Sequence, residues 1–161
     1  MRRVLILGNS GSGKSTLANS LSRSEGLAHF DLDSIAWLPS DPPKRSPISA
    51  CVDQIDQFMS SSNGWVIEGC YADLIELAAP NASDLIFLNL SVDDCIANAR
   101  SRPWEPHKYP SKEAQDRNLT MLIDWIKSYP DREDTCSLQR HIALYESFDG
   151  KKVMKTSNQL R

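Results

Sequence analysis

The feature that most constrains this chain is the run of residues 8–15, GNSGSGKS, which fits the pattern GxxxxGK[ST]. The apolar run 4–7 before it is typical of a strand that is buried on both faces of a parallel sheet. After it, Leu17, Ala18 and Leu21 recur at helical spacing. A strand, a glycine-rich turn and a helix in this order form the context of a P-loop and predict an α/β fold.

The chemistry of a P-loop requires these residue types. Glycines let the backbone turn tightly and approach a ligand, and the N–H groups of the turn, with the positive end of the following helix dipole, attract phosphate oxygens. We expect Lys14 to reach the β- and γ-phosphates of ATP and the Ser15 hydroxyl to bind Mg²⁺. The expected ATP-binding residues are Gly8, Asn9, Ser10, Gly11, Ser12, Gly13, Lys14, Ser15 and Thr16.

Composition limits the other classes. A chain of 161 residues predicts a single domain, 1–161, and a net charge of −3 argues against a dedicated nucleic-acid surface. No apolar run approaches the length needed to span a membrane, and the N-terminal apolar run is too short for a signal peptide. These observations favour a cytoplasmic protein.

The four cysteines, Cys51, Cys70, Cys95 and Cys136, are far apart and form no CxxC pair, so we expect them to be reduced.

Apolar runs and helical patterns alternate along the chain. Beyond the first strand and helix, we expect strands at 27–32, 65–67, 85–90 and 152–155, and helices at 49–59, 71–79, 91–100, 111–128 and 132–147. This alternation predicts a three-layer α/β fold, with helices on both faces of a parallel five-stranded sheet. We interpret the proline-rich stretch 38–48 as an acceptor-binding loop and the segment 100–112 as a lid.

Carboxylates follow two of the predicted strands. Asp31 and Asp33 lie at the C-terminal end of the second strand, where ligands bind in open α/β sheets, and a period of two places them on one face. Asp33 is expected to polarise an acceptor hydroxyl as a general base, with capping of the following helix as the alternative. Asp31 is expected to bind Mg²⁺ through water, and Glu68, after the third strand, to bind Mg²⁺ or substrate.

Three arginines are candidates for charge stabilisation. Arg100 and Arg102 end a helix that points to the predicted site, and they would stabilise the transferring phosphoryl group or, alternatively, interact with the helix dipole. Arg45 would hold an anionic acceptor, or lie exposed in its loop. Trp37 on one side, and Trp104, His107, Lys108 and Tyr109 on the other, would stack on a base or exclude water.

Several of these segments resemble known kinases. Residues 30–35, FDLDSI, resemble the FxDxDxxI segment of shikimate kinases, and residues 67–69, IEG, resemble the (I/L)DG segment of adenylate kinases. The closest overall resemblance is to topology modulation proteins, which are adenylate-kinase-like P-loop proteins of unassigned substrate. The segments that carry it are residues 32–37, Arg45, residues 65–71, and Arg100 with Arg102. Here Glu68 and Cys70 replace the usual Asp and Asn. The resemblance implies a sheet order of 2-3-1-4-5, with Asp31 near Mg²⁺ and Asp33 at the substrate hydroxyl.

The expected site has three groups of residues. The catalytic group consists of Lys14, Asp33, Arg100 and Arg102. The substrate-binding group consists of Asp33, Trp37, Arg45, Glu68, Gly69 and Tyr71. The metal-binding group consists of Ser15, Asp31 and Glu68.

These residues favour a kinase that transfers the γ-phosphoryl group of ATP to a small molecule or a nucleotide. A regulatory ATPase without a small-molecule acceptor is the alternative, although the chain lacks NKxD, LSGGQ and a clear DxxG segment. A phosphate-binding scaffold without turnover is the third hypothesis. The acceptor stays open at this point, because Arg45 points to an anion and Asp33 to a hydroxyl.

Overall fold

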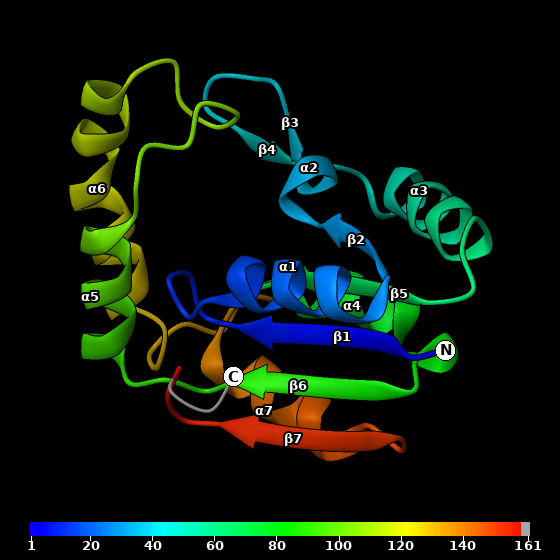
Figure 1. The fold of residues 1–161 in the computed structure, drawn as a ribbon. Helices are drawn as coiled ribbons and strands as arrows, with labels where there is room; N and C mark the ends of the chain where they lie inside the picture. The colour runs from blue at the N-terminus through cyan, green and yellow to red at the C-terminus, as the bar shows by residue number, and fades with distance from the viewer. Residues whose placement is uncertain (159–161) are drawn as a thin grey trace.

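The fold is built on a parallel sheet of five strands (Figure 1). The structure is a computed structural model, and it describes residues 1–158. The strands are β1 (Arg3–Gly8), β2 (Ala28–Asp31), β5 (Trp65–Gly69), β6 (Asp84–Leu88) and β7 (Lys151–Lys155). Their spatial order is β2-β5-β1-β6-β7, which is 2-3-1-4-5 when these five strands alone are numbered along the chain. The predicted α/β class and the last, weakly patterned strand are therefore confirmed.

A second, two-stranded sheet was not predicted. It is an antiparallel hairpin of β3 (Trp37–Leu38) and β4 (Lys44–Arg45), with Trp37 opposite Arg45. Strand β4 lies within the proline-rich stretch 38–48 that the sequence predicts as a loop, and β3 begins one residue before that stretch. Both strands have only two residues, so they are too short to show a period-two pattern.

The helices cover both faces of the main sheet, as Figure 1 shows. They are α1 (Lys14–Glu25), α2 (Asp33–Ala36), α3 (Ile48–Ser60), α4 (Ala72–Ala78), α5 (Val92–Ser101), α6 (Lys112–Lys127) and α7 (Leu138–Ser147), with a 3-10 turn at Ala79–Asn81. In the described part of the chain, 1–158, no helix combines the length and apolarity that crossing a membrane requires.

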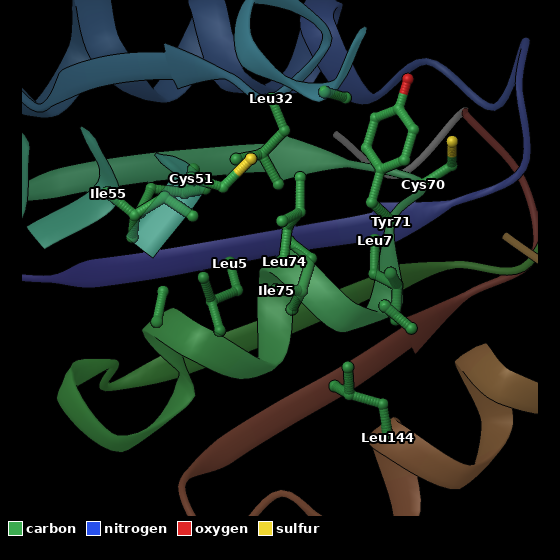
Figure 2. Packing of buried hydrophobic residues seen from close by; sticks show 14 of the residues in the cluster. Leu5, Leu7, Leu32, Cys51, Ile55, Cys70, Tyr71, Leu74, Ile75 and Leu144 are labelled. Carbon is green, nitrogen blue, oxygen red and sulfur yellow. The ribbon is translucent and has the colours of Figure 1, made fainter. Parts of the chain in front are cut away.

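Strand β1 shows how the sequence produces three layers. Its residues Val4, Leu5, Ile6 and Leu7 are all fully buried, because alternate side chains point to opposite faces of the sheet. Leu5 and Leu7 join the core under α3, α4 and α7, which Figure 2 shows at close range. Val4 and Ile6 join the core under α1, α5 and α6. An unbroken apolar run is thus the sequence counterpart of a central strand with helices on both sides.

Helix α7 begins at Leu138, six residues later than the sequence predicts. Residues 132–137 form a turn instead, in which the Arg132 guanidinium donates to the backbone oxygens of Trp125 and Cys136. The Ser137 hydroxyl then accepts the Arg140 N–H and caps the helix. The first six residues of the predicted helix 132–147 therefore form a turn, which hydrogen bonds from the Arg132 side chain to backbone oxygens stabilise.

His141 of α7 is fully buried and connects this helix to the end of β5. Its Nε2 lies 2.6 Å from the Cys70 carbonyl oxygen, and its Nδ1 lies 2.7 Å from the Tyr129 hydroxyl. Because a carbonyl oxygen can only accept, Nε2 carries the proton and Nδ1 accepts from Tyr129. Burial lowers the pKa of His141 to about 3, so the imidazole is neutral in the folded protein at neutral pH.

We expect His141 to make the protein sensitive to acid. Its pKa is about 3 in the folded state and about 6.5 in the unfolded state. The unfolded state therefore binds more protons below pH 6.5, and the stabilisation present above that pH is lost as the pH falls. At pH 5 the loss is about 2 kcal/mol of unfolding free energy.

The measurement is urea denaturation at pH 7.5 and pH 5 for the natural protein and for His141→Gln. Glutamine can donate to Cys70 and accept from Tyr129 but does not titrate. The variant should lose about 2 kcal/mol less than the natural protein between the two pH values. Equal losses in the two proteins would contradict this interpretation.

Candidate active site

The P-loop lies between β1 and α1, as the sequence predicts. Gly13, the residue before α1, has φ 92°, and Gly11 has φ 79°, both in the left-handed region that favours glycine. A Cβ on Gly11 would also meet the backbone oxygen of Cys95 in α5. The loop therefore folds over α5 with no room for a side chain at position 11.

Lys14 and Ser15 begin α1 and point into the site. The Lys14 ammonium donates to the Asn9 carbonyl oxygen across the loop, at 2.8 Å. The Ser15 hydroxyl donates to Oε2 of Glu68 at 2.7 Å. The loop glycines, the ammonium and the N-terminus of α1 together give a cradle whose charge and shape fit the phosphates of a nucleotide.

A pocket of about 550 Å³ joins the P-loop to the ends of β2 and β5 and to the segment after α5. It contains most of the expected site residues: Ser10, Gly11, Gly13, Lys14, Ser15, Thr16, Asp33, Glu68, Gly69 and Arg102. Residues from α1, the end of β5, α5, the segment after α5, α6 and the end of the described chain complete the lining: Asn19, Cys70, Asn98, Ser101, Pro103, Glu105, Lys108, Tyr109, Leu122 and Asn158. The cavity thus joins the P-loop to three of the expected substrate-binding residues, Asp33, Glu68 and Gly69, whereas Trp37, Arg45 and Tyr71 are not among its lining residues.

Glu68 is the centre of the expected metal site. Its side chain is only 2% exposed and receives the Ser15 hydroxyl on Oε2. The same oxygen lies 3.0 Å from Nε2 of His29 in β2. Sequence reasoning missed His29, although the period-two spacing of residues 29 and 31 on a predicted strand was a signal for it.

Asp31 makes a hydrogen bond at the start of α2. Its Oδ1 accepts the N–H of Asp33, the first residue of that helix, at 2.9 Å. Burial, and then the negative charges of Glu68 and Asp33, raise the pKa of Asp31. These carboxylates create a local negative potential that a cation would relieve.

The side chains near Glu68 can supply only part of the oxygen ligands that Mg²⁺ needs. Within residues 1–158, no three His, Cys, Asp or Glu side chains are grouped so that they could hold a metal ion. Mg²⁺ usually keeps several waters and takes oxygens from substrate phosphates, with one or two protein ligands. Ser15 and Glu68 fit this partial set.

Asp33 is held from both sides of the pocket. Its Oδ1 accepts the Tyr71 hydroxyl at 2.5 Å, and its Oδ2 lies 3.5 Å from the Lys108 ammonium. Tyr71 in turn accepts from the indole nitrogen of Trp37 at 2.9 Å. Burial opposes the charge of Lys108, but the carboxylates of Asp33, Asp31 and Glu105 raise its pKa overall.

The segment between α5 and α6 forms one wall of the pocket and extends towards the hairpin of β3 and β4 (Figure 1). Arg102 lines the pocket and pairs with Glu105 at 3.3 Å. Arg100 is exposed and is not among the lining residues. Lys108, to which the sequence gave only a general place in the lid, is the residue that connects this wall to Asp33.

Arg45 and Trp37 lie beside the pocket and are not among its lining residues. Nη2 of Arg45 donates to both carboxylate oxygens of Asp73, at 3.1 and 3.3 Å. It also lies over the rings of Tyr71 and Trp37, 4.9 and 5.9 Å from their centroids. Arg45, which the sequence predicts to bind an anionic acceptor, is therefore paired with the carboxylate of Asp73. This pair attaches the hairpin of β3 and β4 to α4.

The sheet order, the layers and the loop at the end of β1 define the fold of P-loop kinases. Solved structures share it: a gluconokinase from Sinorhizobium meliloti 1021 has a TM-score of 0.54 and 16% identity, over 98% of this chain and 83% of that one. A sugar kinase from Janibacter sp. HTCC2649 has a TM-score of 0.51 and 14% identity, over 96% and 84%. Neither a family model nor a curated protein sequence matches the chain.

The P-loop glycines supply a direct test of this geometry. Gly11→Ala adds a side chain at φ 79° and against the Cys95 carbonyl oxygen, whereas Gly26→Ala adds one at φ 68° with nothing within 4 Å. Gly26→Ala should lower the free energy of unfolding by about 1 kcal/mol through backbone strain. Gly11→Ala should lower it by at least about twice as much, because α5 must also move. Urea denaturation measures both, and equal losses would exclude the close contact with α5.

Proposed function

We propose that the protein is an ATP-dependent phosphotransferase that moves the γ-phosphoryl group of ATP to a hydroxyl of a small molecule. One observation carries the proposal: a single pocket contains both the P-loop and a carboxylate, Asp33, which Tyr71 and Lys108 hold in place. An acceptor bound at Asp33 would share that pocket with the terminal phosphate of a nucleotide held by the P-loop.

The nucleotide end of the site follows from the P-loop. The backbone N–H groups of the loop and the N-terminus of α1 would bind the phosphates, and Lys14 would exchange its bond to Asn9 for the β- and γ-phosphates. Ser15 and Glu68, which share a hydrogen bond, would supply the protein side of a Mg²⁺ site, with Asp31 acting through water. Mg²⁺ bound there would neutralise charge on the phosphates.

The acceptor end depends on Asp33. A hydroxyl that replaces the Lys108 ammonium at Oδ2 would donate its hydrogen bond to Asp33, which takes the proton as the oxygen attacks phosphorus. Lys108 and Arg102, both in the pocket wall, would then face the charge on the transferring group. Arg100 has no place in this arrangement, because it is exposed and lies outside the lining.

A hydroxyl acceptor is favoured over an anionic one. The carboxylates of Asp31, Asp33 and Glu68 repel an anion, and Asp73 already neutralises the most plausible anion ligand, Arg45. Two of the structural neighbours are a sugar kinase and a gluconokinase, whose names agree with a hydroxylated acceptor. We therefore propose a sugar or another uncharged polyhydroxylated molecule as the acceptor class.

The proposed function makes a prediction about nucleotide binding. Lys14→Ala should weaken ATP·Mg²⁺ binding about 10- to 100-fold, since hydrogen bonds to charged groups contribute about 1.5–3 kcal/mol. Lys112→Ala is the matched control, because Lys112 is exposed and pairs with Asp116 on α6. Isothermal titration calorimetry measures both variants. Unchanged affinity in Lys14→Ala, with a native circular dichroism spectrum, would remove the basis of the proposal.

The second prediction concerns turnover. Release of ADP from ATP is measured with sugars, sugar acids, nucleosides and nucleoside monophosphates as acceptors. Asp33→Asn should lower kcat with the best acceptor about 10²- to 10⁴-fold, because it removes the proton acceptor, while ATP affinity stays within about threefold. Asp53→Asn, on an exposed position of α3, is the control. Slow ADP release that no acceptor stimulates would favour a regulatory ATPase instead.

A further inference from the structure

Two cysteines that are 66 residues apart in the chain meet beside the active site. Cys70 follows the last residue of β5, and Cys136 lies in the turn before α7. Their sulfur atoms are 3.2 Å apart and share a hydrogen bond. Both residues are buried, at 8% and 4% exposure. Cys51, in contrast, donates to a backbone oxygen, that of Ile35.

The backbone around both cysteines is fixed by hydrogen bonds. His141 donates to the Cys70 carbonyl oxygen, and Arg132 donates to the Cys136 carbonyl oxygen. The Ala72 N–H also donates to the Thr135 carbonyl oxygen at 3.0 Å, which ties the two segments together next to the sulfur pair. Since a disulfide bond is about 2 Å long, the two sulfurs need to approach by only about 1 Å to become bonded.

Cys70 is the cysteine of the pair that lines the active-site pocket. It does so together with Lys14 and Asp33, whereas Cys136 is not among the lining residues. A small oxidant that enters the pocket therefore meets Cys70 first, which makes Cys70 the nucleophile of the pair and Cys136 the resolving thiol.

We propose that Cys70 and Cys136 form a redox pair, which a peroxide that enters through the active-site pocket converts to an intramolecular disulfide. The Cys70 thiolate attacks one oxygen of hydrogen peroxide, the O–O bond breaks, and a sulfenic acid and one water form after proton transfer. The Cys136 sulfur then attacks the Cys70 sulfur, the S–O bond breaks, and the second water leaves. Two thiols and one peroxide thus give one disulfide and two waters.

The disulfide would act on the site through the neighbours of Cys70. Gly69 lines the pocket, and Tyr71 holds Oδ1 of Asp33. Pulling Cys70 towards Cys136 displaces both neighbours, so we expect oxidation to lower phosphoryl transfer reversibly. A nucleotide in the pocket would shield Cys70 and slow its oxidation. These two consequences rest on the proposed function, whereas disulfide formation itself does not.

The experiment treats the folded protein with hydrogen peroxide, alkylates the remaining thiols and maps peptides by mass spectrometry without reduction. We expect one cross-linked peptide pair, Cys70 with Cys136, which dithiothreitol separates. Cys95→Ala should keep this cross-link, because Cys95 lies in the other core cluster, and Cys136→Ala should abolish it. Cys136→Ser serves as a second variant if Cys136→Ala does not fold. A protein that stays folded and reduced, or that cross-links Cys51 or Cys95 instead, would overturn the proposal.

Nucleotide protection tests the route of the oxidant separately. ATP·Mg²⁺ at a concentration that just saturates the natural protein should slow its cross-linking several-fold and should protect Lys14→Ala much less, because that variant binds the nucleotide more weakly. If ATP binds by calorimetry but does not change the rate, entry through the pocket is wrong. If ATP does not bind at all, the proposed function fails while the cross-link still reports on the redox pair.

Discussion

Parallel pairing of β1 with β5 places Ile6 opposite Glu68 and Leu7 opposite Gly69, so the P-loop and the end of β5 emerge side by side. The hydrogen bond from Ser15 to Glu68 follows directly from this register. A slip of one residue would turn Glu68 to the other face of the sheet and remove the carboxylate from the site. The full burial of Val4, Leu5, Ile6 and Leu7 is what makes such a slip costly.

Negatively charged and positively charged side chains face one another across the pocket. Asp31, Asp33 and Glu68 lie at the ends of β2 and β5, and Lys14 and Lys108 face them from the P-loop and the lid. Burial and the charges of Glu68 and Asp33 raise the pKa of Asp31, while the Lys108 ammonium opposes this shift. The pocket is therefore suited to a ligand that brings phosphates with Mg²⁺ and a hydroxyl, which is the combination that the proposed reaction requires.

The segment before α7 supports the site from behind. His141 and Cys136 both contact Cys70, and Thr135 binds the backbone at the start of α4. Residues far from the chemistry in sequence thus hold the turn that carries Gly69 and Tyr71. This support explains why a change of oxidation state or of protonation there would be felt in the pocket.

The sequence by itself determined the P-loop, the α/β layers and the carboxylates at the strand ends, because these features depend on neighbours along the chain. Periodicity reports which face of an element is buried, and the GxxxxGK[ST] spacing specifies the turn. The sheet order came from the resemblance of short motifs, and the strand pairing confirms it.

Only the tertiary structure decided which side chains meet across elements. His29 reaches Glu68 over 39 residues, Arg45 is neutralised by Asp73 over 28, and Cys70 meets Cys136 over 66. Lys108, in the segment between α5 and α6, likewise lies beside Asp33, 75 residues away in the chain. The physical reason is that such contacts depend on how crossover connections return to the sheet, and no local pattern of residues records the distance between two atoms that separate strands and loops bring together.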